Sequence, residues 1–225
     1  MTTLPSTVVS QAFHFKYNND RFVKRSGGFI QICSATNCKT VFSQEIYDTV
    51  IYNSNNTIEV ITKSTDPIFY PMRPDTTIYT ILNNRPQSKI RYNPTSNYYD
   101  TTLFYYSSNQ KLERTLERSK GAVYEQLYTY NTSGNLEKVT GRITSLFTGT
   151  LLYISEERLG NYDSTRNPLK GYWLWDQCLY GSLSENNFRT YTYYKTDVQT
   201  GGIIQTASKN LILYYDSNGI VDFSK

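Results

Sequence analysis

One spacing of apolar and polar positions recurs along the chain and predicts β-hairpins. A tyrosine follows an apolar residue by two positions, polar turn residues come next, and Val, Ile or Leu stands six positions after the tyrosine, before a charged residue. Alternation with period two places one apolar stripe on one face of a strand. We therefore expect the tyrosines to share one continuous sheet face. They are Tyr17, Tyr52, Tyr106, Tyr130 and Tyr215, with Tyr92 beginning a looser copy.

The residues between the two halves of each repeat favour tight turns. NTSG at 131–134 and DSNG at 216–219 suit a type I turn followed by a left-handed residue. Asn18, Asn55 and Asn109 are expected to serve the same purpose less well than glycine. Each repeat is therefore predicted to be one hairpin.

Further strand-like runs lie between the repeats, and together they predict an all-β fold. Regularly spaced strands favour an antiparallel meander of consecutive hairpins. The chain has only four alanines, which argues against a helical bundle. The runs are FIQI at 29–32, IYTIL at 78–82, LFTGTLLYI at 146–154 and TYTYY at 190–194.

Two segments interrupt this rhythm. A proline-rich stretch over 66–95 predicts a long connection or an irregular edge. The segment 161–187 reads as an insert, with a short helix or irregular structure near 168–187. Because composition does not change across either segment, we expect a single β-rich domain over 1–225.

The composition predicts a hydrophobic core that depends on aromatic residues. The 225 residues include 22 Tyr, 10 Phe and 2 Trp, while hydrophobic residues make up only 38%. The net charge is +4 and no Lys/Arg block is present, so we expect no nucleic-acid partner. No apolar run is long enough for a membrane-spanning helix, and the N-terminus lacks a signal-peptide pattern. We therefore expect either a cytosolic protein or one whose export signal has been removed.

Cysteine and histidine usage predicts no metal site. The spacing of Cys33 and Cys38 is wide for a zinc knuckle, and no second pair completes four ligands. A local disulfide and two unpaired thiols both remain open. The single histidine, His14, is expected to face solvent from a strand, and it leaves no histidine cluster for a metal. We expect no catalytic residues and no cofactor.

Aromatic residues in and near the insert are the candidate ligand-binding residues. If the segment WLWD is a strand, both indole rings share a face and can stack on sugar rings. The alternative is that they anchor the insert onto the sheet, which is favoured because a thin core needs large aromatic anchors. The candidates are Tyr172, Trp173, Trp175, Tyr191 and Tyr193.

YTYNTSGNLEKV at 128–139 and LILYYDSNGIVDF at 211–223 resemble the YD-type repeats of secreted bacterial proteins. More specifically, the order of motifs is similar to that of Bacteroidota lipoproteins of unknown function with degenerate YD-like hairpins. The matching elements here are Tyr162-Asp163 with 167–169, then 184–187, then 214–219. The resemblance covers about residues 90 to 225 well and the first third weakly. Most repeats have Asn where the family pattern has Asp.

This resemblance implies a curled open sheet or partial barrel of porin-like type and no catalytic residues. It also implies export, with the protein outer-membrane-anchored or periplasmic. Because no lipobox is present, we expect an export signal and a lipid anchor to have been removed ahead of Met1. That anchor is the only membrane attachment expected.

Three functional hypotheses remain open. The first is a non-enzymatic, envelope-associated protein that binds a glycan or a peptide, or acts as a scaffold, through an aromatic and polar sheet surface. The second is a glycoside hydrolase that uses two carboxylates in a cleft. The third is a purely structural YD-repeat module, whose sheet edges would self-associate. The carboxylates available to the second are Glu156, Glu157, Asp163, Asp176 and Glu185.

Overall fold

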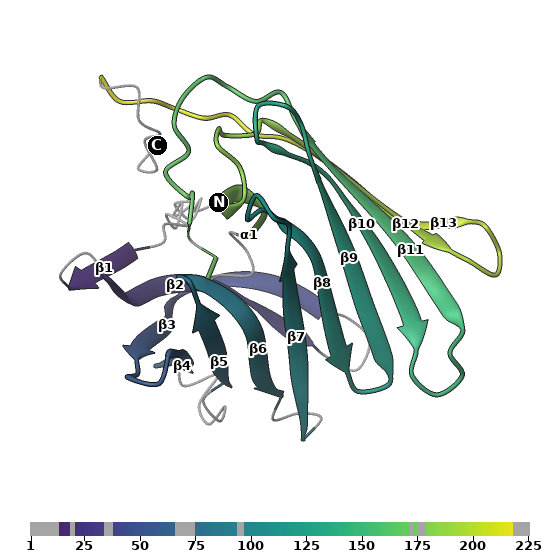
Figure 1. Ribbon diagram of the computed structural model, residues 1–225, viewed down its shortest axis with the longest axis horizontal. Coiled ribbons are helices and arrows are strands. Elements are labelled where there is room, and N and C mark those ends of the chain that lie inside the picture. Colours follow the sequence, from purple (N-terminus) through teal and green to yellow (C-terminus); the bar gives the residue numbers. More distant parts are fainter. Residues whose placement is uncertain are drawn as a thin grey trace, which may run out of the picture. The chain divides into compact units, whose positions relative to one another are not determined.

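The described chain is built almost entirely of antiparallel strands (Figure 1). The computed structural model describes residues 14–18, 21–33, 38–65, 75–93, 97–171, 173–174 and 179–217. Thirteen strands follow one another in a single sheet in the order of the sequence. The order begins at β1 and ends at β13, and no pairing among the described residues joins these two strands. The predicted all-β open meander is confirmed.

The strands differ in length, and the single helix among the described residues is very short. The elements are β1 (His14–Asn18), β2 (Arg21–Cys33), β3 (Cys38–Tyr52), β4 (Thr57–Ser64), β5 (Asp75–Leu82), β6 (Arg85–Asn93), β7 (Tyr98–Tyr106), β8 (Leu112–Ser119), β9 (Ala122–Tyr130), β10 (Leu136–Ser145), β11 (Leu151–Gly160), α1 (Leu179–Ser182), β12 (Thr190–Asp197) and β13 (Ile203–Asn210). The insert thus contains a short helix and irregular chain, as expected.

Three of the predicted hairpins share one turn geometry. The repeat tyrosine pairs with the residue six positions later at β3–β4, β7–β8 and β9–β10. The fourth residue after the tyrosine has a positive φ in each turn: Asn56 (59°), Gln110 (69°) and Gly134 (84°). Gly134 fulfils the predicted left-handed position, because glycine adopts this conformation without steric cost. Asn56 and Gln110 occupy it in the other two turns, rather than Asn55 and Asn109.

The first and last repeats differ in what the structure describes. Tyr17 pairs with Phe22, one residue earlier than the repeat predicts, so the β1–β2 hairpin has another register. The turn that follows Tyr215 lies outside the described residues. His14 is exposed on β1, as predicted. Cys33 and Cys38 are register partners at the end of the β2–β3 hairpin, and their side chains lie outside the described part.

The proline-rich connection expected at 66–95 is shorter than predicted. Residues 75–82 and 85–93 are strands β5 and β6, while 66–74 lie outside the described residues. Asn83 and Asn84 join the two strands with φ values of 53° and 60°. Two consecutive left-handed residues make a type I′ turn, which suits the twist of a hairpin. The prolines around Asn83 and Asn84 obscured this turn signal in the sequence.

The described chain divides into two compact units, 1–78 and 79–225. The first unit buries Ile46, Val50, Ile58 and Val60 from β3 and β4. A buried ion pair lies beside them, with Arg25 Nε 2.7 Å from Asp48 Oδ2. Thr62 also donates a hydrogen bond to Asp48 at 2.7 Å. The charge of Asp48 is thus doubly compensated, as burial requires.

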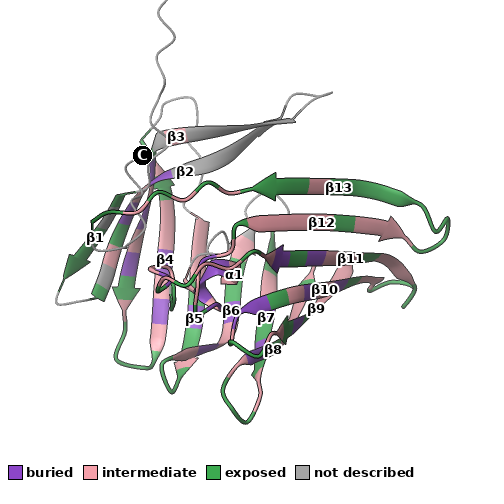
Figure 2. Ribbon diagram, turned by 90° about the horizontal axis from the view of Figure 1, so that it is seen from above, coloured by how far each residue is buried: buried purple, intermediate pink, exposed green. Residues whose placement is uncertain are grey.

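The second unit has its core on one face of strands β7–β11. Figure 2 shows that the buried positions of these strands lie nearest to α1. Residues of the insert and of the chain that follows it pack on this core, among them Tyr180, Leu183 and Phe188. The insert therefore covers the apolar part of the sheet. The buried core residues are Phe104, Leu112, Tyr128, Leu136, Val139 and Leu159.

Tyrosine hydroxyls join neighbouring hairpins in the second unit. Tyr106, at the end of β7, donates to the carbonyl of Pro86 on β6 at 2.9 Å. Tyr130, at the end of β9, donates to the carbonyl of Leu112 on β8 at 3.0 Å. Tyr162, two residues after β11, donates to the carbonyl of Leu136 on β10. We call these three hydrogen bonds the tyrosine clamps.

A basic side chain covers the ring in two of the tyrosine clamps. The Arg85 guanidinium lies 5.6 Å from the ring centre of Tyr106, and the Lys111 ammonium lies 4.8 Å from that of Tyr130. Each basic residue directly precedes the residue whose carbonyl accepts the clamp. In the third clamp this position holds Asn135. Tyr106 and Tyr130 both pack against the same core, so they share one sheet face as predicted.

Loss of a clamp hydroxyl should destabilise the second unit. We expect Tyr130→Phe to lower the free energy of unfolding by about 1 kcal/mol, because the Leu112 carbonyl loses its side-chain donor. Urea denaturation at pH 7 measures the change. Tyr194→Phe is the matched control, because Tyr194 is 40% exposed. Equal effects of the two substitutions would contradict the clamp.

The clamps also predict how stability depends on alkaline pH. Burial raises the pKa of Tyr106 and Tyr130 above the usual value of about 10. Their stabilising contribution is therefore complete below about pH 10 and is lost as pH rises further, because the unfolded chain releases these protons first. Urea midpoints between pH 8 and 11 should fall above about pH 10. A Tyr106→Phe/Tyr130→Phe variant should show a shallower fall, and an unchanged slope would contradict the assignment.

Candidate functional site

The described members of the sequence-predicted aromatic set make separate contacts. The ring of Trp173 packs edge-on against that of Tyr79, with 5.6 Å between ring centres. Tyr79 is 3% exposed, and its hydroxyl donates to the carbonyl of Leu174 at 3.2 Å. These contacts support the anchor interpretation of Trp173. Tyr172 and Trp175 lie outside the described residues.

Tyr191 and Tyr193 lie on β12, two positions apart and therefore on one face. The Tyr191 hydroxyl donates to Glu157 Oε2 at 2.6 Å, and the Tyr180 hydroxyl donates to Glu157 Oε1 at 2.6 Å. Burial, with the nearby Glu157 carboxylate, raises the pKa of both hydroxyls. Glu157 is 8% exposed. The two carboxylate oxygens of Glu157, on β11, thus hold Tyr180 of the insert and Tyr191 of β12.

The network around Glu157 continues across the sheet through polar side chains. Gln126 donates to the Tyr180 hydroxyl at 2.9 Å and accepts from the Tyr128 hydroxyl at 3.0 Å. A buried polar network of this kind stabilises one packing arrangement when its members are paired. The arrangement positions α1 rather than leaving a carboxylate open to a substrate.

A second set of hydrogen bonds holds the insert at its other end. Asn135 donates to Asn186 Oδ1 at 3.1 Å and accepts from the Asn186 N–H at 2.8 Å. Ser184 is fully buried and accepts from the Leu136 N–H at 3.1 Å. Asn167, 3% exposed, donates to the carbonyl of Ser184 at 3.0 Å. The short polar motifs of the insert therefore attach it to the sheet by hydrogen bonds.

The other carboxylates considered for hydrolysis are bound separately. Glu156 pairs with Arg158 at 2.6 Å, and it faces away from its neighbour Glu157 because side chains alternate along a strand. Glu185 pairs with Lys170. Asp163 accepts from Asn187 and Tyr215. Asp176 lies outside the described residues. These contacts give no pair arranged around a cleft in the described part.

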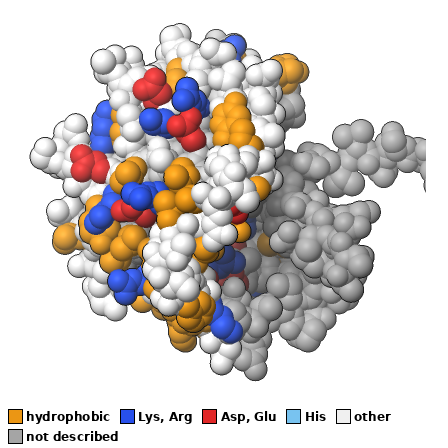
Figure 3. Space-filling view, turned by 90° about the vertical axis from the view of Figure 1, so that its right-hand side faces the viewer, with side chains coloured by type: hydrophobic (Ala, Val, Ile, Leu, Met, Phe, Trp, Pro, Cys, Tyr) orange, Lys and Arg blue, Asp and Glu red, His pale blue; other side chains and the backbone are white. Residues whose placement is uncertain are grey.

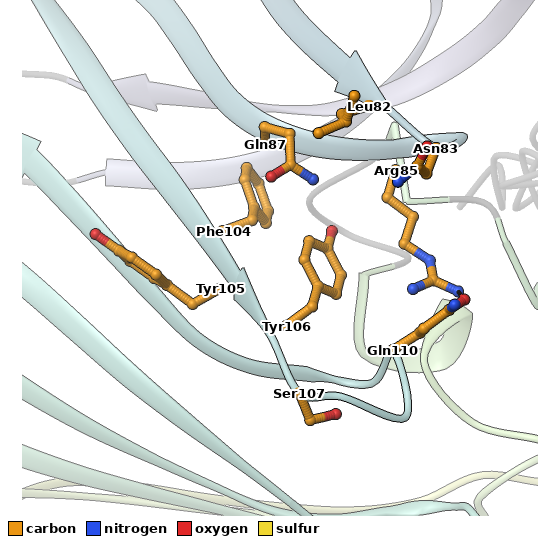
Figure 4. A pocket seen from close by; sticks show the side chains of 9 residues that line it. All are labelled: Leu82, Asn83, Arg85, Gln87, Phe104, Tyr105, Tyr106, Ser107 and Gln110. Carbon is orange, nitrogen blue, oxygen red and sulfur yellow. Dashed lines mark hydrogen bonds between the residues drawn. The ribbon is translucent and has the colours of Figure 1, made fainter.

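A pocket of about 390 Å³ lies at the turn ends of β5–β6 and β7–β8 (Figure 4). Rings from β7 form one side of it, and polar side chains from the two hairpins form the other. The pocket lining includes no acidic residue. We call it the Arg85 pocket. Its lining residues are Leu82, Asn83, Arg85, Gln87, Phe104, Tyr105, Tyr106, Ser107 and Gln110.

The polar groups of the Arg85 pocket are held in defined positions. Arg85 donates to Gln110 Oε1 at 2.6 Å, and its guanidinium lies over the Tyr106 ring. The tyrosine clamp to Pro86 fixes Tyr106 in turn. Phe104 is buried at 8% exposure, and Figure 4 shows Gln87 above the rings of Phe104 and Tyr106. The pocket therefore combines a cation, amides and aromatic carbon.

The sequence analysis missed this pocket, although a signal was present. A basic residue directly precedes the residue whose carbonyl accepts the clamp in two hairpins: Arg85 is the first residue of β6, and Lys111 stands just before β8. The repeat pattern does not include this position, so it did not single out the basic residues. The type I′ turn at 83–84 was also not recognised, and this turn brings Arg85 beside the β7–β8 turn.

A second and more open depression has a volume of about 650 Å³ and includes Asp163 and Arg189. Arg189 donates to the Tyr215 hydroxyl at 3.2 Å, and that hydroxyl donates to Asp163. Burial acts to raise the pKa of Asp163, but hydrogen bonds from Tyr215, Thr165 and Asn187 outweigh it and lower the pKa. The groups of this depression thus mainly bind one another.

The face of the described chain drawn in Figure 3 carries hydrophobic side chains in several patches, with basic and acidic side chains between them. Ion pairs contribute to the mixture, with Arg114 3.5 Å from Glu125. Among the described residues no group of three His, Cys, Asp or Glu could hold a metal ion. Nor is any helix of the described chain both long and apolar enough to cross a membrane.

Comparison with known proteins establishes the fold alone. No family model matches the sequence, and no curated protein matches it. The chain is similar in structure to a porin-like protein from Bacteroides uniformis, with a TM-score of 0.50 and 12% sequence identity. The likeness covers 92% of this chain and 78% of that chain. The predicted porin-like meander is confirmed.

Removing the Asn135 side chain should loosen the insert. We expect Asn135→Ala to lower the free energy of unfolding by about 2–3 kcal/mol, because two hydrogen bonds with Asn186 are lost at a buried position. Urea denaturation measures the change. The control is Asn210→Ala, because Asn210 is exposed on β13. A loss no larger than that of the control would contradict the role assigned to Asn135.

Proposed function

We propose that this protein is a non-enzymatic protein of the bacterial cell envelope that binds a glycan through aromatic and polar side chains of its sheet. The observation that carries the proposal is the Arg85 pocket, which places a guanidinium, amide groups and aromatic rings around one space. Specific ligand sites join apolar surface with a few well-placed polar groups in this way. Recognition needs no more than these groups.

The absence of carboxylates from the pocket lining favours binding over glycoside hydrolysis. Retaining and inverting glycosidases typically need two carboxyl groups on either side of the scissile bond. The lining of the Arg85 pocket has none. Among the described candidates, Glu156, Glu157, Asp163 and Glu185 each already bind a neighbouring side chain.

The envelope location rests on two independent supports. The order of YD-like motifs resembles that of exported Bacteroidota lipoproteins, and a solved structure with a similar fold is a porin-like protein from Bacteroides uniformis. We propose an outer-membrane-anchored or periplasmic position, with attachment only through a lipid anchor. The purely structural module is the outcome to be expected if no ligand is found.

A glycan array tests the proposed function. We expect the purified protein to bind a restricted set of glycans, and Gln87→Ala to lose that binding because its amide lies inside the pocket. Gln205→Ala, on the exposed strand β13, should retain it. Trp173→Ala is measured beside them, with circular dichroism to confirm folding. Binding lost in Trp173→Ala but kept in Gln87→Ala would move the site to the insert. No binding by the unmodified protein would favour a scaffold.

A further inference from the structure

We propose that the Arg85 pocket binds a sugar that carries a carboxylate, a uronic acid unit of an anionic glycan, with Arg85 as the anion-binding group. This inference rests on the proposed function and names the ligand class for its site. It starts from the charge of Arg85, which is half-buried in the pocket wall.

Arg85 lines the pocket and has no carboxylate partner among the described residues. Arg25, Arg114, Arg158 and Lys170 each form an ion pair. Arg85 instead donates one hydrogen bond to the neutral amide of Gln110 and lies over the Tyr106 ring. A guanidinium has five N–H donors, and most of those of Arg85 are therefore available to a ligand. A planar carboxylate matches this fork with two parallel hydrogen bonds.

The other groups of the Arg85 pocket suit a sugar ring rather than a small inorganic anion. The Gln87 side chain lines the pocket and has no hydrogen-bond partner among the described residues, and its amide can both donate to and accept from hydroxyl groups. Leu82, which is 57% exposed, supplies apolar surface for the carbon face of the ring. The volume of about 390 Å³ lies at the lower end of the usual range of ligand pockets. Such a space holds a short piece of glycan.

An acidic peptide fits the surroundings less well. Extended peptides usually gain affinity by adding a strand to a free sheet edge. Strands β5, β6, β7 and β8 are all interior strands of the sheet and have neighbours on both sides. No free edge lies at the pocket, so a peptide would have to bind by its side chains alone.

Isothermal titration with paired ligands tests the inference. The probes are oligosaccharides of homogalacturonan, alginate and hyaluronan, each with its methyl-esterified form, which keeps the ring and removes the charge. We expect at least one acid form to bind about tenfold or more tightly than its ester, as loss of a charge-assisted hydrogen bond implies. Arg85→Gln should bind acid and ester equally, and Arg85→Lys should retain part of the preference because lysine lacks the fork.

Lys111→Gln is the matched control. Lys111 holds the same position as Arg85 in the next hairpin and lies over Tyr130, but it lines no part of the Arg85 pocket. It should keep the full preference, so a loss there would overturn the role of Arg85.

The remaining outcomes separate this inference from the function on which it rests. Equal binding of acids and esters by the unmodified protein overturns the inference and leaves glycan binding standing. Binding of neutral glycans alone also overturns the inference and leaves glycan binding standing. An acidic peptide that binds as tightly as every uronate overturns the choice of a sugar. No binding of any glycan, on the array or in solution, overturns both proposals.

Discussion

A buried tyrosine hydroxyl needs a hydrogen-bond partner, and this requirement organises the second unit of the protein. With 38% hydrophobic residues the chain has little aliphatic material, so tyrosines supply much of its packing surface. Each clamp tyrosine packs its ring against the core and donates a hydrogen bond from its hydroxyl to a carbonyl on the neighbouring strand. Tyrosine thereby supplies apolar area for the core and keeps neighbouring hairpins from sliding past each other.

The clamps also explain which polar residue stands before each carbonyl that accepts a tyrosine hydrogen bond. In the first two clamps a cation covers the tyrosine ring, and the site stays accessible enough to form the Arg85 pocket. In the third, Asn135 takes that place and is 2% exposed, because the insert is fastened there through Asn186. The same repeat unit therefore serves as a recessed polar site in one hairpin and as an attachment point in another.

The hairpins could be predicted because their signal is local. Tyrosine spacing, turn residues and period two lie within about ten residues, and the β7–β8 and β9–β10 turns follow directly from them. The Arg85 pocket could not be predicted, because it depends on how Arg85 of one hairpin meets Gln110 of the next. The sequence grouped Trp173 and Tyr191 because both are aromatic residues in or near the insert. In the structure Trp173 contacts Tyr79, and Tyr191 contacts Glu157. Such contacts depend on the path of the insert, which has no periodicity.

The sequential strand order has a consequence for how the chain folds. Neighbouring strands are also neighbours in sequence, so most pairings close only a short loop, and the low entropic cost favours rapid formation of these hairpins. The β11–β12 pairing is the exception, because the insert separates these two strands. The insert behaves differently, because its contacts span 51 residues from Asn135 to Asn186 and 95 residues from Tyr79 to Leu174. We expect these long connections to form last. Docking of the insert would then complete folding, with the hairpin array acting as the template that receives it.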